Sequence, residues 1–321
     1  MLNIIEASDK NLDKWDELIG NSINGTIFHL EKFLSYHGER FKDRGKFLYI
    51  CEGTQPFAQI SLTIEEQDGE CLARSPYGAS YGGVVFQSYP GYRKGKEIVQ
   101  LILDYLKQHQ VDRFIITPPI ACCSKSSLDT FNFNLLEAGF KSINRDISSV
   151  YYFENRPVFE CLPSKVRNTI RTAEKNDIEI RQNADIRDFW QVLSSTYFKH
   201  GTNPTHSIEE FNLLMDLLPG RIYTNVAYKD GIPVAGVACF EINKLTNSSF
   251  YLCQFQEYQK YQALSLLVMT TLESSREKGF SFFDFGTSTV NMQARPNIFT
   301  FKEHFTKIGQ FRETFEWKRQ P

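Results

Sequence analysis

Two segments in opposite halves of the chain share one pattern of aromatic and polar residues. Both begin F-Q-x-Y-x-x-Y, the first at Phe86 and the second at Phe255. Each is followed by an apolar stretch with the period of a helix, and then by a short strand pattern. A repeated order of elements limits the chain to folds in which two similar units each bury their own apolar faces.

The repeat extends upstream of these segments. A strand, a polar turn and a second strand are predicted over residues 47–62 and again over residues 225–240. Strands of this kind, followed by a helix and a further strand, are typical of helices packed on a mixed sheet. We therefore predict an α+β fold of two tandem domains, residues 1–155 and 156–321.

The composition excludes several classes of protein. Hydrophobic residues make up 41% and charged residues 23% of the chain, which fits neither a disordered nor a collagen-like protein. The net charge is −2 and the pI is about 6.3, so no strong overall field attracts DNA or an anionic membrane. The patterns of a Rossmann glycine loop, a P-loop, a G-x-S-x-G elbow and an H-E-x-x-H helix are missing from the sequence. Dinucleotide, serine-hydrolase and zincin chemistry are therefore disfavoured.

The sequence also gives expectations about compartment. Glu6 and Asp9 arrive before an apolar segment can form, so no secretory signal is expected. The longest mostly apolar run, residues 263–272, falls short of the roughly 20 residues that a membrane span needs. The 7 cysteines are an odd number and lack the spacing of a zinc site. We expect a cytoplasmic protein with reduced cysteines, no membrane span and no metal.

A basic helix is predicted to start at Ser164, with the sequence SKVRNTIRTAEK. Arg167 and Arg171 are four positions apart, so they share one face of it. Guanidinium groups on such a face suit a phosphate or carboxylate, although a solvated basic face gives the same pattern. We predict Arg167 and Arg171 as substrate-binding residues. We add His200, at the end of the next predicted helix, where a capping histidine is the alternative.

A predicted strand ends in the sequence DFGTS, which starts at Asp284. Small polar residues after a strand often line a ligand cleft, so Thr287 and Ser288 are predicted to contact substrate. Asp284 stands among phenylalanines, where a desolvated carboxylate can act as a base. An aspartate that caps the following loop is the alternative.

Lys302 lies between two phenylalanines in a short predicted helix. Its charge either reaches solvent or points into a cleft, where it would stabilise an oxyanion. We predict Lys302 as catalytic, with Asp284 and Tyr251 as proton acceptor or positioning residues; simple packing is the alternative for Tyr251. The aromatic residues of the segment 280–315 are expected to form the apolar wall of an acyl channel beside Lys302.

A third cationic segment, YPGYRKGKE, precedes a predicted helix in the first half. Its glycines and cations suit phosphates, so Arg93, Lys94 and Lys96 are predicted as donor-binding residues. A solvated turn is the alternative. The matching segment of the second half, YQKYQALS, has no glycine.

Three motifs of the second half together resemble the Fem-type branch of the GNAT superfamily. They are S-K-x-R-N-x-I-R-x-A-E-K from Ser164, F-D-F-G from Phe283 and F-x-F-K-x-x-F from Phe299. The resemblance implies tandem GNAT-like domains and acyl transfer to an amine without a covalent intermediate. It also implies an acceptor drawn from cell-envelope or polysaccharide precursors, with Arg167 and Arg171 near it and Lys302 in the acyl channel.

Two other functions stay open at this point. One is an aminoacyl-tRNA-dependent ligase of peptidoglycan bridges, although the chain lacks the charged heptads of the helical arm that some such members carry. The other is a non-catalytic module that binds a nucleotide-sugar precursor. No bound cofactor is expected; acyl-CoA and aminoacyl-tRNA are the candidate donors. Expected partners are a small-molecule, lipid-linked or nucleotide-linked envelope precursor, with tRNA left open and DNA not expected.

Overall fold

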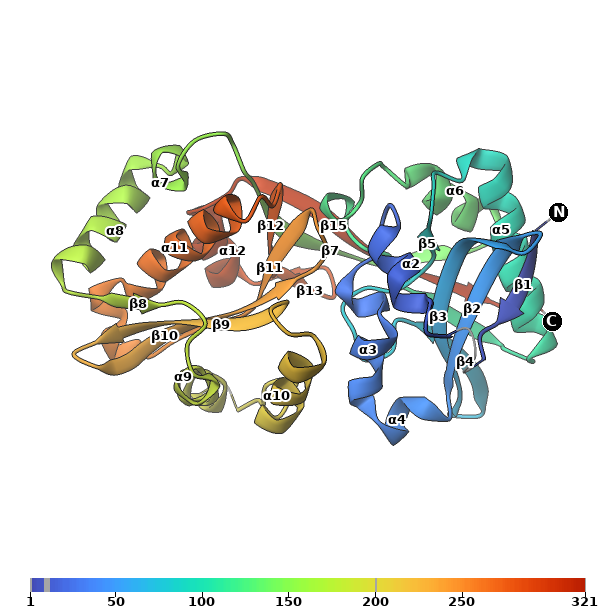
Figure 1. Ribbon diagram of the computed structural model, residues 1–321, viewed down its shortest axis with the longest axis horizontal. Helices are drawn as coiled ribbons and strands as arrows, with labels where there is room; N and C mark the ends of the chain where they lie inside the picture. The colour runs from blue at the N-terminus through green and yellow to red at the C-terminus, as the bar shows by residue number, and fades with distance from the viewer. Residues whose placement is uncertain (1, 9–11, 200, 321) are drawn as a thin grey trace. The chain divides into compact units, whose positions relative to one another are not determined.

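The computed structural model describes residues 2–8, 12–199 and 201–320, and the chain divides into two compact units (Figure 1). Unit 1 comprises Met1–Ile147, Thr289–Gln293 and Gln310–Pro321, and unit 2 comprises Ser148–Ser288 and Ala294–Gly309. Each unit is a sheet with helices on both faces.

The sheet of unit 1 has the strand order β1-β2-β3-β4-β6-β15, with β5 beside β3. The pair β4–β6 is parallel, and the other pairs are antiparallel. One face is covered by α5, whose apolar side chains recur at helical spacing, as in Ile98, Ile102 and Leu106. The strands are β1 (Leu2–Glu6), β2 (Gly45–Glu52), β3 (Gln55–Gln67), β4 (Glu70–Ser75), β5 (Val85–Phe86), β6 (Arg113–Ile116) and β15 (Ile308–Lys318). The helices are α2 (Trp15–Asn21), η1 (Ile27–His29), α3 (Glu31–Leu34), η2 (Ser35–His37), α4 (Glu39–Lys42), α5 (Gly91–Gln108), η3 (Ala121–Cys123) and α6 (Asp129–Glu137).

The sheet of unit 2 has the strand order β8-β9-β10-β11-β12-β7, and its one parallel pair among these described strands is β11–β12. Figure 1 shows α8 and α11 on one face of this sheet and α9 and α10 on the other. The strands are β7 (Lys141–Tyr152), β8 (Glu179–Arg181), β9 (Ile222–Lys229), β10 (Ile232–Glu241), β11 (Thr246–Gln254) and β12 (Phe282–Thr287). Only residues 148–152 of β7 belong to unit 2, and residues 141–147 belong to unit 1. A small hairpin pairs β13 (Thr289–Val290) with β14 (Gln293–Ala294), and its residues 289–293 belong to unit 1. The helices are α7 (Val158–Cys161), α8 (Ser164–Lys175), α9 (Ile186–Lys199), α10 (Ile208–Leu217), η4 (Gln256–Tyr261), α11 (Ala263–Glu277) and α12 (Pro296–Glu303).

The two units repeat one order of elements, which confirms the α+β tandem fold predicted from the duplicated pattern. Each repeat begins with a short strand and helices, which are followed by three strands. A helix, a strand, a second helix and a last strand then complete the repeat. The last strand of each repeat is exchanged between the units. β7 closes the first repeat but pairs with β12 of unit 2, and β15 closes the second but pairs with β6 of unit 1.

This exchange gives units whose residues differ from the expected division at residue 155. Residues 310–321 belong with unit 1, and residues 148–155 belong with unit 2. A strand's own pattern specifies which face is buried but not which distant strand it joins, so the exchange leaves no local trace in the sequence.

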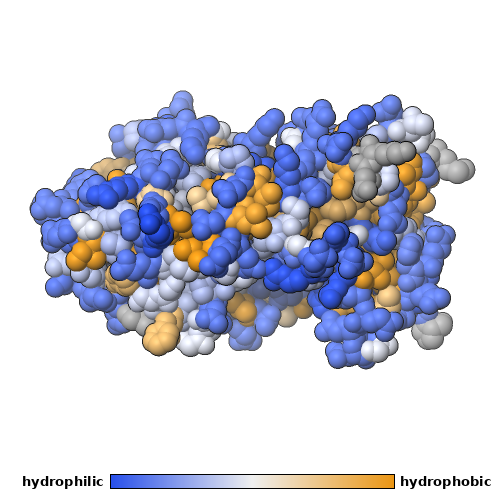
Figure 2. Space-filling model, turned by 60° about the horizontal axis from the view of Figure 1, so that its bottom comes forward, coloured by the Kyte–Doolittle hydropathy of each residue, from blue (hydrophilic) through white to orange (hydrophobic). Residues whose placement is uncertain are grey.

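The surface is mostly hydrophilic on the face seen in Figure 2, with apolar side chains gathered in small separate patches. In the described part of the chain, no helix combines the length and the apolar character required to cross a membrane.

Candidate functional site

The parallel pair β11–β12 is interrupted soon after it begins. Its pairing covers Thr246–Ser248 against Phe282–Asp284, although both strands continue further. The register of β12 against β7 also shifts just after Asp284, and the register of β11 against β10 shifts near the same place. Such irregularities re-aim backbone and side-chain groups and are frequent beside active sites.

Asp284 lies at this interruption and is only 3% exposed. Its Oδ1 accepts hydrogen bonds from the hydroxyl of Ser148 on β7 and, at 2.8 Å, from the backbone N–H of Gly286. Gly286 has φ of 72°, a left-handed conformation that glycine adopts without strain. The carboxylate therefore fixes the turn that ends β12, which is the capping alternative anticipated for it.

Lys302 reaches the same turn from α12. Pro296 starts this helix, where a residue without an N–H costs no hydrogen bond. The Lys302 side chain is 5% exposed, and its Nζ donates to the carbonyls of Gly286 and Thr287, both at 2.8 Å. Burial lowers the pKa of Lys302 to about 8, although the negative charge of Asp284 acts in the opposite direction.

The helix that carries Lys302 packs its aromatic rings against β12. Phe285 on β12 and Phe301 on α12 each pack against Phe305, with ring centroids 5.9 and 5.6 Å apart. Phe285 and Phe305 are buried in the core of unit 2. Lys302 thus does not extend along the surface into solvent, and its charge lies in the low-dielectric surroundings where it has the largest effect.

Ser249 on β11 lies beside the same turn. The Ser249 carbonyl on β11 and the Lys302 ammonium both lie 4.0 Å from the point where a Cβ on Gly286 would stand. The Ser249 hydroxyl is buried and has no hydrogen-bond partner within the described ranges. A buried hydroxyl without a partner costs roughly 1–3 kcal/mol, which makes it a candidate ligand contact. Ser148 and Ser249 escaped the sequence analysis because each lies inside an ordinary strand pattern.

The two residues that follow Gly286 differ in their contacts. Thr287 contributes its carbonyl to Lys302, as described above. Ser288 is fully buried, and its hydroxyl is hydrogen-bonded to that of Ser149 at 2.8 Å. The predicted substrate contacts of Thr287 and Ser288 stay predictions, and the hydroxyl of Ser288 is already bonded within the protein.

The two arginines of α8 also differ. The Nε of Arg167 is buried and has no hydrogen-bond partner among the described residues, while its Nη2 donates to Ser164 at 3.4 Å. Arg171 is exposed, donates to Asn168 at 3.1 Å and lies 5.4 Å over the ring of Phe159.

The start of α8 lies near the end of α12. The evidence is electrostatic: after burial, the positive charges of Lys165 and Lys307 are what lower the pKa of His304. The helix that carries Arg167 is therefore close to the segment that carries Lys302.

Tyr251 lies instead with the aromatic side chains of α9 and α10, including Phe189 and Phe211. Its hydroxyl is 2.9 Å from Nδ1 of His206, and burial raises the pKa of Tyr251 to about 12. His206 is itself buried. His200, the remaining predicted binding residue of this region, lies outside the described residues.

The three predicted phosphate-binding cations belong to unit 1, where they are helical rather than in a loop, because α5 already begins at Gly91. Lys94 forms an ion pair with Glu52 at 3.1 Å, and Lys96 forms one with Glu137 at 3.2 Å. Arg93 is exposed. Their role in donor binding stays a prediction, with two of the three cations already paired within unit 1.

Directly beyond the ends of β4 and β6 in unit 1, the backbone packs closely against itself. Beyond the parallel pair β4–β6, the N–H of Gly82 donates to the Thr117 carbonyl, and the N–H of Gly83 donates to the Ser75 hydroxyl, both at 2.8 Å. A Cβ on Gly82 would stand 2.3 Å from the nitrogen of Pro76, so this loop packs backbone against backbone. The candidate site is therefore the one in unit 2.

Comparisons with known proteins agree with this location. Residues 164–302 match the family model of the acetyltransferase (GNAT) domain, a segment that starts with α8 and ends at Lys302. The chain matches no curated protein sequence.

Three solved structures share the fold over nearly the whole chain. FemX is similar with a TM-score of 0.75 and 11% identity, covering 99% of this chain and 97% of that one. A tandem GNAT protein from the clavulanic acid biosynthesis pathway has a TM-score of 0.59 and 11% identity, covering 100% and 99%. L-PGS from Bacillus licheniformis has a TM-score of 0.59 and 11% identity, covering 98% and 94%. Residues 164–302 thus match a GNAT acetyltransferase domain, and the whole chain has the fold of FemX and of a tandem GNAT protein.

Proposed function

We propose that unit 2 transfers an acyl or aminoacyl group to an amine by direct attack. The observation that carries the proposal is the buried Lys302 ammonium, held beside the interrupted β11–β12 pair in the segment that matches an acetyltransferase domain. An ammonium has three N–H donors, of which two bind the carbonyls of the β12 turn. The third is left to stabilise the tetrahedral oxyanion.

In this mechanism the amine nitrogen bonds to the acyl carbon, and the carbonyl electron pair moves onto oxygen. The pair then returns, the bond to the leaving thiolate or tRNA hydroxyl breaks, and the amine proton passes to the leaving group or to solvent. Lys302 acts on the oxyanion, whereas Asp284 acts through Lys302 and the turn, as a positioning residue. None of these steps needs a covalent enzyme intermediate.

The identity of the acyl donor is the first point to establish by experiment. The tandem GNAT protein of the clavulanic acid pathway is described in a form without AcCoA, so acyl-CoA is the donor to test first. Charged tRNA, the other donor that the sequence motifs suggested, should be tested beside it. We expect one donor to bind the purified chain and to be consumed when an amine-bearing envelope or polysaccharide precursor is added. Binding of a nucleotide-sugar without turnover under either donor would contradict acyl transfer and favour the non-catalytic module.

We also propose that the protein acts in the cytoplasm, where both donors are made. The buried cysteines Cys51, Cys239 and Cys253 are free thiols, as expected of a reducing compartment.

Arg167 and Arg171 give a matched pair for testing substrate binding. We expect Arg167→Ala to raise the KM for one substrate about tenfold, because a guanidinium with a buried unpaired Nε is placed to receive an anionic group. Arg171→Ala should change KM less than about twofold, since its guanidinium is exposed and already bonded. Steady-state kinetics on both variants check this, and equal effects would show that α8 contributes only a general positive field.

Tyr251→Phe separates packing from catalysis. The change removes the hydrogen bond with His206, so we expect a loss of about 1 kcal/mol in the free energy of unfolding. The rate of acyl transfer should stay within about twofold, because a buried phenol with a pKa of about 12 is a poor proton acceptor near neutral pH. Urea unfolding and kinetics on one preparation measure both, and a rate loss above about tenfold would restore Tyr251 to the catalytic set.

A further inference from the structure

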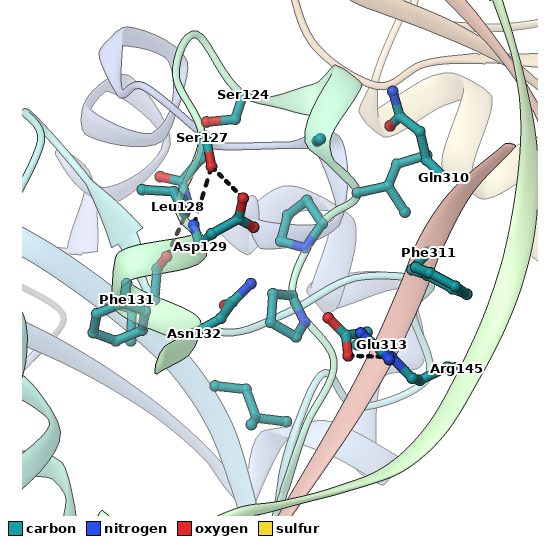
Figure 3. A pocket seen from close by; sticks show the side chains of 17 residues that line it. Ser124, Ser127, Leu128, Asp129, Phe131, Asn132, Arg145, Gln310, Phe311 and Glu313 are labelled. Atoms are coloured by element: carbon teal, nitrogen blue, oxygen red, sulfur yellow. Dashed lines mark hydrogen bonds and ion pairs between the residues drawn. The ribbon is translucent and has the colours of Figure 1, made fainter. Parts of the chain in front are cut away.

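Unit 1 contains a cavity that the proposed transfer does not use. It measures about 290 Å³ and is lined by the start of α6 and by residues of β7 and β15 (Figure 3). Its apolar lining residues include Ile116, Pro118 and Pro119. Polar side chains also line it, and Figure 3 shows Asp129 and Asn132 on one side with Arg145 and Glu313 on the other.

The polar groups of the cavity retain hydrogen-bonding capacity. The amide of Asn132 makes no side-chain hydrogen bond with any residue that the structure describes. One carboxylate oxygen of Asp129 accepts from the Ser127 hydroxyl at 2.8 Å, and the other has no such partner in the described chain. The Nε of Arg145 pairs with Glu313 at 2.7 Å, and its guanidinium carbon lies 4.6 Å over the Phe311 ring. The arginine is thus held in place with its terminal N–H groups left as donors.

The charge of the lining argues against an anionic ligand. Asp129 and Glu313 are two negative charges, whereas Arg145 is the single cation among the lining residues and is already paired. A phosphate would need more than one free cation. The lining instead offers carboxylate acceptors and side-chain amides. These groups suit a ligand with hydroxyl groups, which can both donate and accept hydrogen bonds, or with an amine.

We propose that this cavity binds a pyranose sugar and prefers an amino sugar. The hydroxyls of such a ring pair with Asn132 and with the free N–H groups of Arg145, and its ammonium pairs with Asp129. The apolar C–H face of the ring packs on Pro118 and Pro119, while Phe311, 53% exposed, forms an apolar edge of the site.

The size of the cavity agrees with one ring. Small-molecule pockets measure roughly 300–1,000 Å³, so 290 Å³ is at the lower end. A second hollow of about 300 Å³ shares Asp129, Asn132, Arg145 and Glu313 with it, which leaves room for the next ring of a disaccharide. The inference is independent of acyl transfer, because it concerns unit 1 alone and a ligand that binds without any donor.

Binding to the full chain in the absence of donor tests the proposal. Calorimetric titration compares glucosamine, glucose and glucose 6-phosphate as probes. We expect glucosamine to bind more tightly than glucose, and glucose 6-phosphate to bind more weakly than both. Binding of the phosphate in preference to glucosamine, or no saturation with glucosamine in the millimolar range, would overturn the proposal.

Three variants locate the site. Asn132→Ala should weaken glucosamine binding about tenfold, while Gln108→Ala, which removes an exposed amide at the end of α5, should leave it unchanged. Asp129→Asn should remove the preference for glucosamine over glucose, because it removes the partner of the ammonium. Residue 132 lies within α6, where alanine is a favourable residue, so the Asn132→Ala protein should keep the melting temperature of the parent. Equal binding by the Asn132→Ala and Gln108→Ala proteins would contradict the assignment to this cavity.

Discussion

Replacing Lys302 with methionine is expected to lower the rate of acyl transfer by about 10²–10³-fold, the usual loss when a donor to the oxyanion is removed. Methionine keeps much of the length and apolar character of the buried lysine stem. It has neither the charge nor the N–H donors that bind the turn after β12. The rate loss would therefore report on the ammonium rather than on packing.

The same substitution should change the free energy of unfolding by less than about 1 kcal/mol. A fall in the pKa of Lys302 from 10.5 to about 8 means that holding the charge in the folded protein costs roughly 3 kcal/mol. Methionine removes this cost but leaves two carbonyls without their donor, each worth about 1–1.5 kcal/mol. The two effects nearly cancel. Kinetics and urea unfolding on one preparation measure both quantities.

Lys307→Met is the matched control, because Lys307 is an exposed lysine only five positions further along the chain. It should keep its activity. If Lys302→Met also kept acyl transfer within about twofold, the assignment of Lys302 as the oxyanion donor would be wrong.

The pH dependence of the rate separates an electrostatic role of Lys302 from a basic one. Lys302 is charged below its pKa of about 8, so a rate that needs the ammonium falls as the pH rises through that value. A rate that needed the neutral amine would rise instead. The unfolded chain, with the ordinary lysine pKa of 10.5, binds more protons than the folded chain between about pH 8 and 10.5. The cost of burying the charge is thus fully present below pH 8 and is relieved as the pH rises through this window.

The duplicated aromatic pattern made the tandem fold predictable, because it repeats a whole order of elements. Phe86 ends β5 and is followed by α5, while Phe255 follows β11 and is followed by η4 and α11. The exchange of β7 and β15 could not be predicted in this way. Which distant strand each one joins is decided by pairing across the assembled sheet, and that leaves no periodic signal in the strand itself.

The candidate site was also predictable only in part. Motifs with unusual local composition led to Asp284, Gly286 and Lys302, which the fold brings to one turn. Ser148 comes from the first repeat and reaches Asp284 only through the strand exchange, so its contribution had no sequence signal. The cavity of unit 1, which Asn132 and Arg145 help to line, had no sequence signal for a similar reason. The elements that form it, α6, β7 and β15, come together only in the folded unit.

Asp284→Asn should shift the pH profile rather than abolish activity. Asparagine keeps an oxygen that accepts from the Gly286 N–H, so the turn is retained. It removes the negative charge that raises the pKa of Lys302. The pKa of the ammonium then falls further, by roughly one unit for the loss of a nearby opposite charge. The descending limb of the rate against pH should move to lower pH by the same amount, so the rate should fall about twofold near pH 7 and about fivefold near pH 8.

Ser148→Ala is the control for this shift, because it removes a donor to the Asp284 carboxylate but leaves the charge in place. Its descending limb should stay within a few tenths of a pH unit of the parent profile. A general base at position 284 would behave differently: Asp284→Asn would then lower the rate at every pH, with the limb unmoved. Since the carboxylate already accepts two donors within the protein, including the N–H of the turn that Lys302 binds, we expect the shift. Asp284 would then affect the reaction by setting the pH range in which Lys302 is charged.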